Sequence, residues 1–344
     1  MRIAEIAPVW VPVPPPTYGG IELIVSLLSD GLTERGHDVT LFAAPGSRTR
    51  ARLVSPVSQS RELSEMGSDV GDEIVHALPA YLAEGEFDVI HDHTGLGTAL
   101  GAARRGDPPV VHTLHGPWTD ASRRFYQAVS PPVHLIAISE AQAAGNADLQ
   151  YAGVVHNGLD LTAHPWRKEK EDFLLFLGRC NREKGPEHAV DVARRAGLPL
   201  VLMVKRSQRH EIEYWDEHVA PRLTGTEEIV LDATHEQKVD YLGRAKATLF
   251  PIQWPEPFGL VMIESMACGT PVVAMRCGAA PEIVVDGQTG FLTPTIDALV
   301  DAVGKVGTIS PEACREHVAA KFSADALVAK TEAVLERVVA KRAG

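Results

Sequence analysis

The amino-acid sequence predicts an α/β protein of two domains, each built on a parallel β-sheet that is covered by helices on both faces. Short apolar runs alternate with amphipathic segments along the chain, which is typical of βα units. The alternation pauses once and then restarts, which indicates a second domain. The length of 344 residues agrees with two domains of about 150 residues each.

The first half begins with an apolar strand at Arg2–Ala7 and a helix at Gly19–Arg35. Apolar side chains recur on one face of that helix at the spacing of helical turns. The other elements predicted in this half are a helix at Val70–Glu84 and strands at Val39–Ala44, Phe87–His91, Val110–Thr113 and His134–Ile138. We expect the proline-rich segment Pro12–Pro16 to be a loop.

Around Asn157-Gly158 the pattern pauses, and the polar segment Ala163–Asp172 is typical of a linker. The second half then predicts strands at Phe173–Gly178, Pro199–Val204, Glu228–Leu231 and Ala247–Phe250, and helices at Glu187–Ala196, Gln237–Ala245 and from Leu299 to the end. We therefore expect a first domain over residues 1–162, a linker over 163–172 and a second domain over 173–322. The remaining residues, 323–344, are expected to form a C-terminal helix that could pack back on the first domain.

The segment Glu256–Glu264 predicts a loop that leads into a buried helix. Pro257 suits the first turn of a helix, because its missing N–H has no intrahelical partner there. Gly269 suits the end of that helix, where a left-handed backbone is needed. The first N–H groups of such a helix carry a partial positive charge and favour phosphate. These groups are expected at Phe258, Gly259 and Leu260.

Charge and composition exclude several classes of partner. The net charge is −12, and residues 1–160 hold ten arginines, no lysine and 19 acidic residues, which gives −9 and leaves −3 for the rest. Neither half has the basic surface that nucleic acid selects, and association with an anionic membrane is disfavoured for the same reason. No apolar run reaches the length of a membrane span.

The cysteines and the first residues indicate a cytoplasmic protein. Four cysteines lie in the second half without zinc-ligand spacing, and unpaired thiols are typical of a reducing compartment. Met1–Trp10 lacks the long apolar region of a signal peptide, and we interpret it as a strand. The oligomeric state is not predicted.

A set of motifs occurs in a characteristic order and spacing over nearly the whole chain. They are Tyr18–Glu22, Arg35–Val39, His112–Gly116, His156–Asp160, Gly178–Gly185, Glu256–Glu264, Cys268–Val273, Pro281–Gly287 and Thr289–Phe291. In these motifs the chain resembles the retaining glycosyltransferases of family 4, whose GT-B fold has two Rossmann-like domains facing across a cleft. The resemblance implies a metal-independent enzyme without a cofactor. It would move a sugar from a nucleotide-diphosphate sugar to a hydroxyl of a small-molecule or glycan acceptor.

Two cations, Arg179 and Lys184, are candidates for holding the diphosphate. By themselves they could be solvated surface residues at the start of a helix. A guanidinium can also bind two phosphate oxygens at once, and an ammonium adds a point charge. The resemblance implies this second role.

The two glutamates of the Glu256–Glu264 motif are expected to have different roles. Glu264 falls in an apolar helical segment, and a buried carboxylate needs partners. The resemblance implies that ribose hydroxyls are those partners and that Glu256 contacts the donor sugar. Glu256 could also be a carboxylate that caps the helix.

In the first domain, Gly19 and Gly20 open a helix after a strand and a loop. They could simply provide a flexible backbone, but the resemblance implies a close approach of backbone to phosphate. The spacing is not G-x-G-x-x-G, which disfavours a dinucleotide fold of the dehydrogenase type.

Four histidines, at 91, 93, 112 and 115, lie close to the ends of two predicted strands. A zinc site is disfavoured, and we expect no metal. Three of the rings could be structural, with their N–H groups bonded to backbone carbonyls. The resemblance implies that His115 contacts the donor sugar near the reacting centre, and Tyr18, Asp92 and His93 are candidates for the acceptor side.

Two departures from the family's pattern leave the nucleotide open. Lys205 and Arg206 follow Val204 where the family usually has a glycine, and Asp232 stands where a glycine often follows the next strand. Asp232 could instead cap the next helix. Two other functions stay open on the sequence: a sugar-nucleotide-binding protein without transfer activity, and a sugar-nucleotide epimerase of the same fold.

Overall fold

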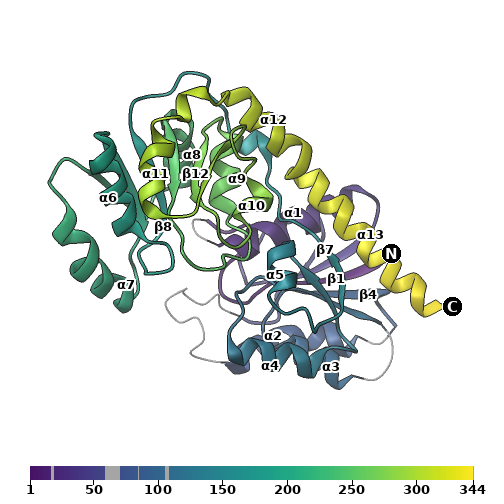
Figure 1. The fold of residues 1–344 in the computed structure, drawn as a ribbon. Coiled ribbons are helices and arrows are strands. Elements are labelled where there is room, and N and C mark those ends of the chain that lie inside the picture. Colours follow the sequence, from purple (N-terminus) through teal and green to yellow (C-terminus); the bar gives the residue numbers. More distant parts are fainter. Residues whose placement is uncertain (17–18, 59–69, 84, 105–107, 344) are drawn as a thin grey trace. The chain divides into compact units, whose positions relative to one another are not determined.

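The computed structural model describes residues 1–344 except 17–18, 59–69, 84, 105–107 and 344. The chain divides into two compact units, the first with Met1–Gly158 and Ala324–Gly344 and the second with Leu159–Ser323. Within the described residues each unit holds one sheet whose paired strands run parallel (Figure 1). The predicted α/β fold with two doubly wound sheets is confirmed.

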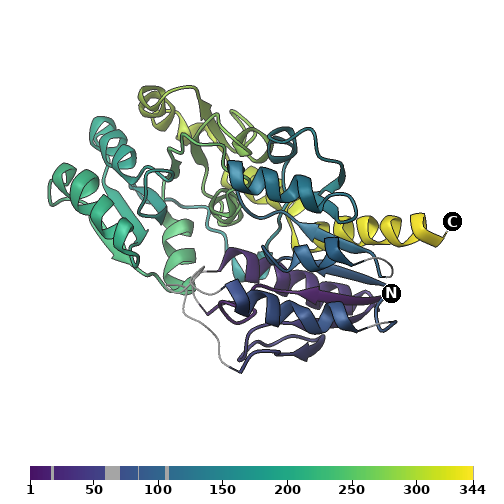
Figure 2. The ribbon, with the colours of Figure 1, turned by 90° about the horizontal axis from the view of Figure 1, so that it is seen from below.

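The sheet of the first unit has seven strands among the described residues, in the order β3-β2-β1-β4-β5-β6-β7. They are β1 (Arg2–Ile6), β2 (Asp38–Phe42), β3 (Arg52–Val54), β4 (Val89–Asp92), β5 (Val110–Thr113), β6 (His134–Ala137) and β7 (Tyr151–Val154). The helices are α1 (Gly20–Glu34), α2 (Val70–Leu82), α3 (Thr98–Ala103), α4 (Asp120–Val129), α5 (Glu140–Ala144) and α13 (Ala324–Ala343). Helices α2, α3 and α4 lie along one face of this sheet, and α1 and α13 lie together on the other (Figure 1, Figure 2).

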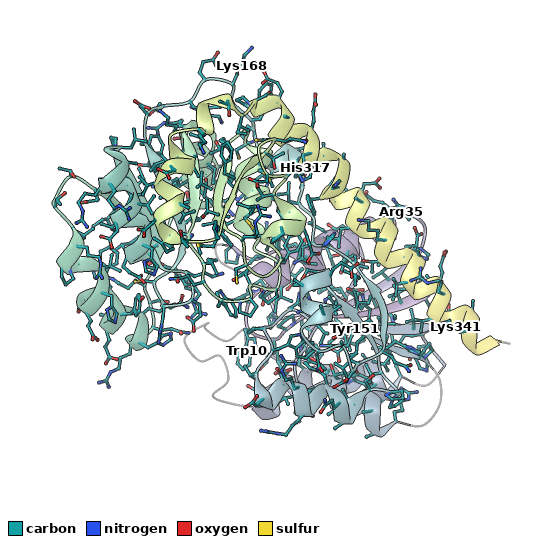
Figure 3. All side chains as sticks on the ribbon, viewed as in Figure 1. Trp10, Arg35, Tyr151, Lys168, His317 and Lys341 are labelled. Atoms are coloured by element: carbon teal, nitrogen blue, oxygen red, sulfur yellow. The ribbon has the colours of Figure 1, made fainter. Side chains whose placement is uncertain are left out.

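Helix α13 belongs to the first unit although it is the last element in the sequence. It crosses α1 closely at Gly31, where a Cβ would lie 2.5 Å from a methyl group of Val328. At the end of α1, Arg35 donates to Asp325 at 2.5 Å and to Glu332 at 3.0 Å (Figure 3). Helices α1 and α13 are therefore held together by close packing at Gly31 and by the ion pairs of Arg35.

The sheet of the second unit has six strands among the described residues, in the order β10-β9-β8-β11-β12-β13. They are β8 (Leu174–Arg179), β9 (Leu200–Lys205), β10 (Glu228–Leu231), β11 (Ala247–Phe250), β12 (Val272–Met275) and β13 (Gly290–Thr293). The helices are α6 (Pro186–Ala196), α7 (Arg209–Tyr214), α8 (His235–Arg244), α9 (Leu260–Ala267), α10 (Ala280–Ile283), α11 (Ile296–Val303) and α12 (Pro311–Lys321).

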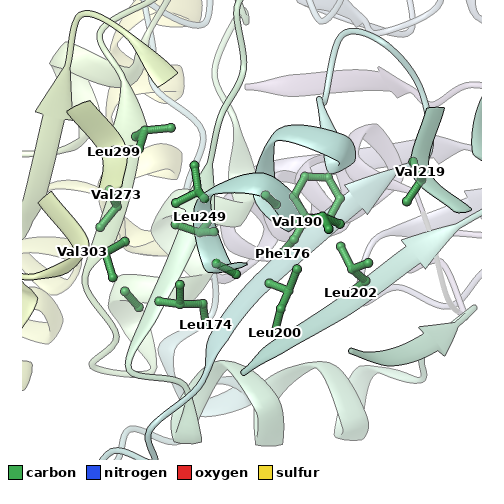
Figure 4. Packing of buried hydrophobic residues seen from close by; sticks show 14 of the residues in the cluster. Leu174, Phe176, Val190, Leu200, Leu202, Val219, Leu249, Val273, Leu299 and Val303 are labelled. Atoms are coloured by element: carbon green, nitrogen blue, oxygen red, sulfur yellow. The ribbon is translucent and has the colours of Figure 1, made fainter. Parts of the chain in front are cut away.

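The core of the second unit lies on both faces of its sheet. On one face, Leu174 and Phe176 of β8 and Leu202 of β9 pack against α6 and α11 (Figure 4). On the other face, Leu175 of β8 packs with side chains of α8. Each fully buried side chain of this kind contributes about 1.5–3 kcal/mol by its removal from water. Burial on both faces explains why these strands have apolar runs without alternation.

The helical run predicted from Leu299 to the end is interrupted in the structure. Helix α11 ends at Val303, and Ser310 caps α12, whose first residue is Pro311. A proline is favoured at the first helical position but breaks a helix at later ones. The segment is therefore three helices, of which the last, α13, belongs to the first unit.

Candidate functional site

The candidate residues of the second unit gather where the order of its strands reverses. From β8 the chain builds the sheet in one direction through β9 and β10, and from β11 it builds in the other through β12 and β13. In such sheets ligands bind at the carboxyl ends of the two strands that flank the reversal. Arg179 ends β8, and the loop that carries Glu256 follows β11.

Arg179 is held in place by two residues of the α7 region. Its Nε donates to Oε1 of Glu211 at 2.7 Å, and its Nη2 donates to Oε1 of Gln208 at 2.8 Å. Burial raises the pKa of Glu211, but backbone N–H donors and Arg179 outweigh it and hold the pKa below its usual range. Among the described residues Nη1 of Arg179 has no hydrogen-bond acceptor.

Lys184 and Glu256 form an ion pair at this place, with 2.8 Å between Nζ and Oε2. Asn181 accepts a hydrogen bond from the backbone N–H of Lys184, which turns the chain back toward β8. A Cβ at Gly178 would lie 3.7 Å from Cβ and Cγ of Lys184, so the lysine stem runs close beside the end of β8. The ammonium also lies 5.8 Å from the centre of the Trp254 ring.

The loop that carries Glu256 is packed against a glycine. Gly278 has a φ of +54°, and a Cβ there would overlap the backbone of Glu256, with only 2.5 Å to its carbonyl oxygen. The N–H of Ala279 donates to that same oxygen at 3.0 Å. The position of Glu256 therefore depends on a residue without a side chain at 278.

Helix α9 begins later than the sequence predicts. Its first residue is Leu260 and its N-cap is Gly259, with a φ of +90°. Pro257 lies in the preceding loop, so the prediction that it opens the helix is wrong. The left-handed backbone at Gly259 turns the chain from the loop into the helix, a conformation that proline cannot adopt.

Phe258 is buried, with its ring 6.0 Å from that of Phe322. The predicted left-handed residue after the helix, Gly269, has a φ of +79°.

Glu264 is buried on α9 and paired with Lys238 of α8. The distance from Lys238 Nζ to Glu264 Oε1 is 2.6 Å, and the ring of His164 lies 4.0 Å from the same oxygen. Burial alone would raise the pKa of Glu264, but Lys238 and His164 outweigh it and hold the pKa below its usual range. No local sequence pattern marks Lys238, because its helix and α9 meet only in the folded chain.

The first unit has its own reversal, between β1 and β4. Gly19 is the N-cap of α1 and Gly20 its first residue, and both follow the loop after β1. Tyr18 lies outside the described residues. A Cβ at Gly19 would come within 2.7 Å of Pro15 and 2.9 Å of the Glu22 carboxylate. Any larger residue at position 19 would therefore collide with Pro15 and Glu22, which explains why the N-cap of α1 is a glycine.

Glu22, in the first turn of α1, gives a testable dependence of stability on pH. Burial raises its pKa to about 7, so its protonated form favours folding below pH 4.5 and that contribution is lost as the pH rises to about 7. Glu22→Gln cannot ionise, so it should gain stability relative to the wild type between pH 5 and pH 8, by about 2.5 kcal/mol. Thermal unfolding of both proteins at pH 5 and pH 8 measures the difference in their free energies of unfolding. A difference that is the same at the two pH values would contradict the prediction.

Asp92, a candidate for the acceptor side, is buried at the end of β4. Tyr81 donates to its Oδ2, and the N–H and hydroxyl of Thr94 donate to its Oδ1. Burial raises its pKa to about 6, although these hydrogen bonds oppose the shift. The carboxylate thus holds the loop after β4 in shape.

The four histidines are bonded to side chains. His91 lies between Glu5 and Thr113, and His112 lies between Thr98 and Tyr126. For His91 and His93, polar side chains take the place of the backbone carbonyls considered from the sequence, whereas His112 also bonds to the backbone of Asp92. His93 contacts both Glu5 and His115.

One oxygen of Glu5 and one nitrogen each of His91 and His93 lie within 4.8 Å of one another, a set that could hold a metal ion. In this structure all three side chains are hydrogen-bonded to one another or to neighbours.

The two departures near the expected base pocket have a structural basis. Strand β9 continues through Lys205, where the family usually has a glycine. Asp232 has a φ of +47°, a left-handed conformation that aspartate tolerates better than most residues. The interpretation of Asp232 as a helix cap is wrong, since Thr234 caps α8 through a capping box with Gln237.

No helix of the described residues is long and apolar enough to cross a membrane. The four cysteines are unpaired thiols, three of them buried.

The chain is similar in sequence and in fold to known glycosyltransferases. The chain is 28% identical over 326 residues to a phosphatidyl-myo-inositol mannosyltransferase of Propionibacterium freudenreichii, covering 84% of this chain and 80% of that protein. It is 27% identical over 332 residues to a D-inositol 3-phosphate glycosyltransferase of an Arthrobacter species, covering 80% and 78%. The crystal structure of AviGT4, a glycosyltransferase involved in avilamycin A biosynthesis, superposes with a TM-score of 0.75 at 26% identity, covering 99% of this chain and 98% of AviGT4.

Two family models divide the chain between them. Residues 18–163 match Glycosyltransferase Family 4, and residues 163–321 match the glycosyl transferases group 1. The two matches meet near the boundary of the structural units and together span residues 18–321. The protein is therefore an enzyme that belongs to the glycosyltransferases of family 4 and group 1.

Proposed function

We propose that the enzyme transfers a sugar from a nucleotide-diphosphate sugar to a hydroxyl acceptor, with retention of the anomeric configuration and without a metal ion. The observation that carries this proposal is the Lys184–Glu256 pair at the strand reversal of the second unit. It places a cation and a carboxylate side by side, one suited to phosphate and the other to sugar hydroxyls.

Departure of the nucleoside diphosphate leaves negative charge that the site has to stabilise. Lys184, the remaining nitrogen of Arg179 and the N–H groups at Gly259 and Leu260 are the groups proposed to do this. Such preorganised donors act on charge as it develops and need no rearrangement. Because two side-chain cations are present, the proposed step does not require a divalent metal. Gly19 and Gly20 are the proposed phosphate contacts of the first unit.

The sugar and the ribose are assigned to different carboxylates. Glu256 and His115 are proposed to orient the transferred sugar. Glu264 is proposed to accept hydrogen bonds from the ribose, with Lys238 keeping it ionised. The charged partner of Glu256 is a lysine, which does not match the paired carboxylates of retaining glycosidases. The proposal is therefore a front-face transfer in which the leaving phosphate helps to deprotonate the acceptor.

Transfer assays with labelled UDP-, GDP-, ADP- and dTDP-sugars test the function. Inositol phosphates are suitable first acceptors, because two relatives carry inositol in their names. We expect release of nucleoside diphosphate only when acceptor is present, a product with the donor's anomeric configuration by NMR, and an unchanged rate in EDTA. An inverted product would contradict retention, and loss of activity in EDTA would contradict metal independence. Conversion of donor to an isomer without acceptor would favour an epimerase.

A further inference from the structure

A chain of hydrogen bonds connects the buried carboxylate of Glu5 to His115 in the first unit. His93 Nε2 lies 2.6 Å from Glu5 Oε1, and His93 Nδ1 lies 2.8 Å from His115 Nε2. Glu5 is the second-last residue of β1, while His93 follows β4 and His115 follows β5. These strands are neighbours in the order β1-β4-β5, so the chain of bonds crosses the sheet toward the carboxyl ends of its strands.

Glu5 is unusual for its position. Its neighbours in β1 are apolar, and its side chain is fully buried. Removing a carboxylate from water is costly unless partners compensate. His91 and His93 are those partners, at 3.1 and 2.6 Å from Oε1. An apolar residue would fill this place at lower cost, so the carboxylate calls for an explanation beyond packing.

The contacts determine which nitrogen of each ring carries the proton. An ionised carboxylate only accepts hydrogen bonds, so His93 must donate to Glu5 from Nε2. A neutral His93 has one N–H, which leaves Nδ1 as an acceptor, and His115 must then donate from Nε2. A neutral His115 consequently has a lone pair on Nδ1. Among the described residues no hydrogen bond is recorded to that nitrogen.

The electrostatics agree with this arrangement. The two histidines lower the pKa of Glu5 to about 2 although burial alone would raise it. Burial, together with His91, lowers the pKa of His93 to about 4 and outweighs the opposing effect of Glu5. The pKa of His115 lies well below its usual range, chiefly because of burial and then because of His93. At neutral pH Glu5 is therefore ionised, and the rings of His93 and His115 are neutral.

We propose that Glu5 and His93 are positioning residues that hold His115 in its Nε2–H tautomer, so that Nδ1 accepts a hydrogen bond from a hydroxyl of the bound sugar. This inference rests on the proposed function, in which His115 orients the sugar. Without these hydrogen bonds, the ring of His115 would populate both neutral tautomers. One of them would place an N–H donor at Nδ1, where the sugar hydroxyl needs an acceptor.

The test reads the tautomer directly in the ligand-free enzyme, by long-range ¹H–¹⁵N NMR of protein labelled with [¹⁵N]histidine. The wild type should show His115 protonated at Nε2 only. His93→Leu removes the acceptor and should give a mixture of tautomers, with kcat for transfer about tenfold lower. His93→Gln keeps one donor and one acceptor and should restore both the tautomer and most of the rate.

His112→Gln is the matched control, because His112 is a buried ring of the same cluster that bonds to Thr98 and Tyr126 instead. It should leave the His115 tautomer unchanged. A His115 protonated at Nδ1 in the wild type would overturn the proposal even if no variant folds. So would a stoichiometric metal in the purified enzyme, since Glu5 and His93 would then be ligands. A wild type that has the expected tautomer but no transfer activity would overturn the proposed function, while the positioning of His115 by Glu5 and His93 would stand.

Discussion

Replacement of Lys184 by alanine should lower kcat for sugar transfer about 100-fold, the usual cost of removing one preorganised donor from developing charge. The ammonium is proposed to stabilise the departing diphosphate, and no second lysine is recorded at Glu256 among the described residues. The same change removes the partner of a carboxylate that is largely buried. The lost charge stabilisation and the unpaired Glu256 both slow the proposed transfer step. We therefore expect a larger fold-change in kcat than in the affinity for nucleotide.

The measurement is steady-state transfer together with calorimetric binding of nucleoside mono- and diphosphates. Lys184→Ala should weaken binding of the diphosphate more than that of the monophosphate. Glu264→Ala should weaken both equally, because the proposed ribose contact is common to them. Lys246→Ala serves as the control, since that lysine pairs with the exposed Asp172. Unchanged turnover and affinity in both Lys184→Ala and Glu264→Ala would show that the site is placed wrongly.

Gly278→Ala should have an effect of similar size by a different route. A methyl group at this position would overlap the backbone of Glu256, so the loop that carries this carboxylate has to move. A displacement of about 1 Å near a reacting centre can reduce the rate about 100-fold. We expect this loss in kcat, with a lower temperature of unfolding as well.

Gly287→Ala separates the two contributions to that loss. Gly287 also has a left-handed backbone, with a φ of +76°, but a Cβ there would meet nothing within 4 Å. The alanine at 287 should therefore cost about 1–2 kcal/mol of stability from backbone strain and leave kcat unchanged. Equal rates in the two variants would mean that Gly278 does not position Glu256.

The strands and long helices could be predicted because burial imposes a pattern on neighbouring residues. Phe173–Gly178 is an apolar run since β8 is covered on both faces, and the prediction differs from the observed strand by one residue at each end. Helix α4 is absent from the sequence prediction although Phe125, Tyr126 and Val129 lie on one face of it and pack against the core, because three apolar residues within a short polar segment are a weak signal. The start of α9 was misplaced because Pro257 is a local signal, whereas the backbone at Gly259 determines where the helix begins.

The site could be predicted only as far as single residues. The motifs indicated Arg179, Glu256 and Glu264, but the residues that hold them are far away in the sequence. Glu211 lies 32 positions from Arg179, and Lys238 lies 26 positions from Glu264. Tertiary packing creates such pairs, and no local spacing records them. The sequence does contain one sign of the buried histidine cluster, which is Glu5 within the apolar strand Arg2–Ala7.

The place of α13 has a consequence for synthesis of the protein on the ribosome. The chain emerges from its N-terminus, so residues 1–158 are made long before Ala324–Ala343. Until then the side of α1 around Gly31 lacks its cover, while residues 159–323 can already fold. The first unit therefore finishes folding last, and a version of it produced separately needs residues 324–343 supplied with residues 1–158.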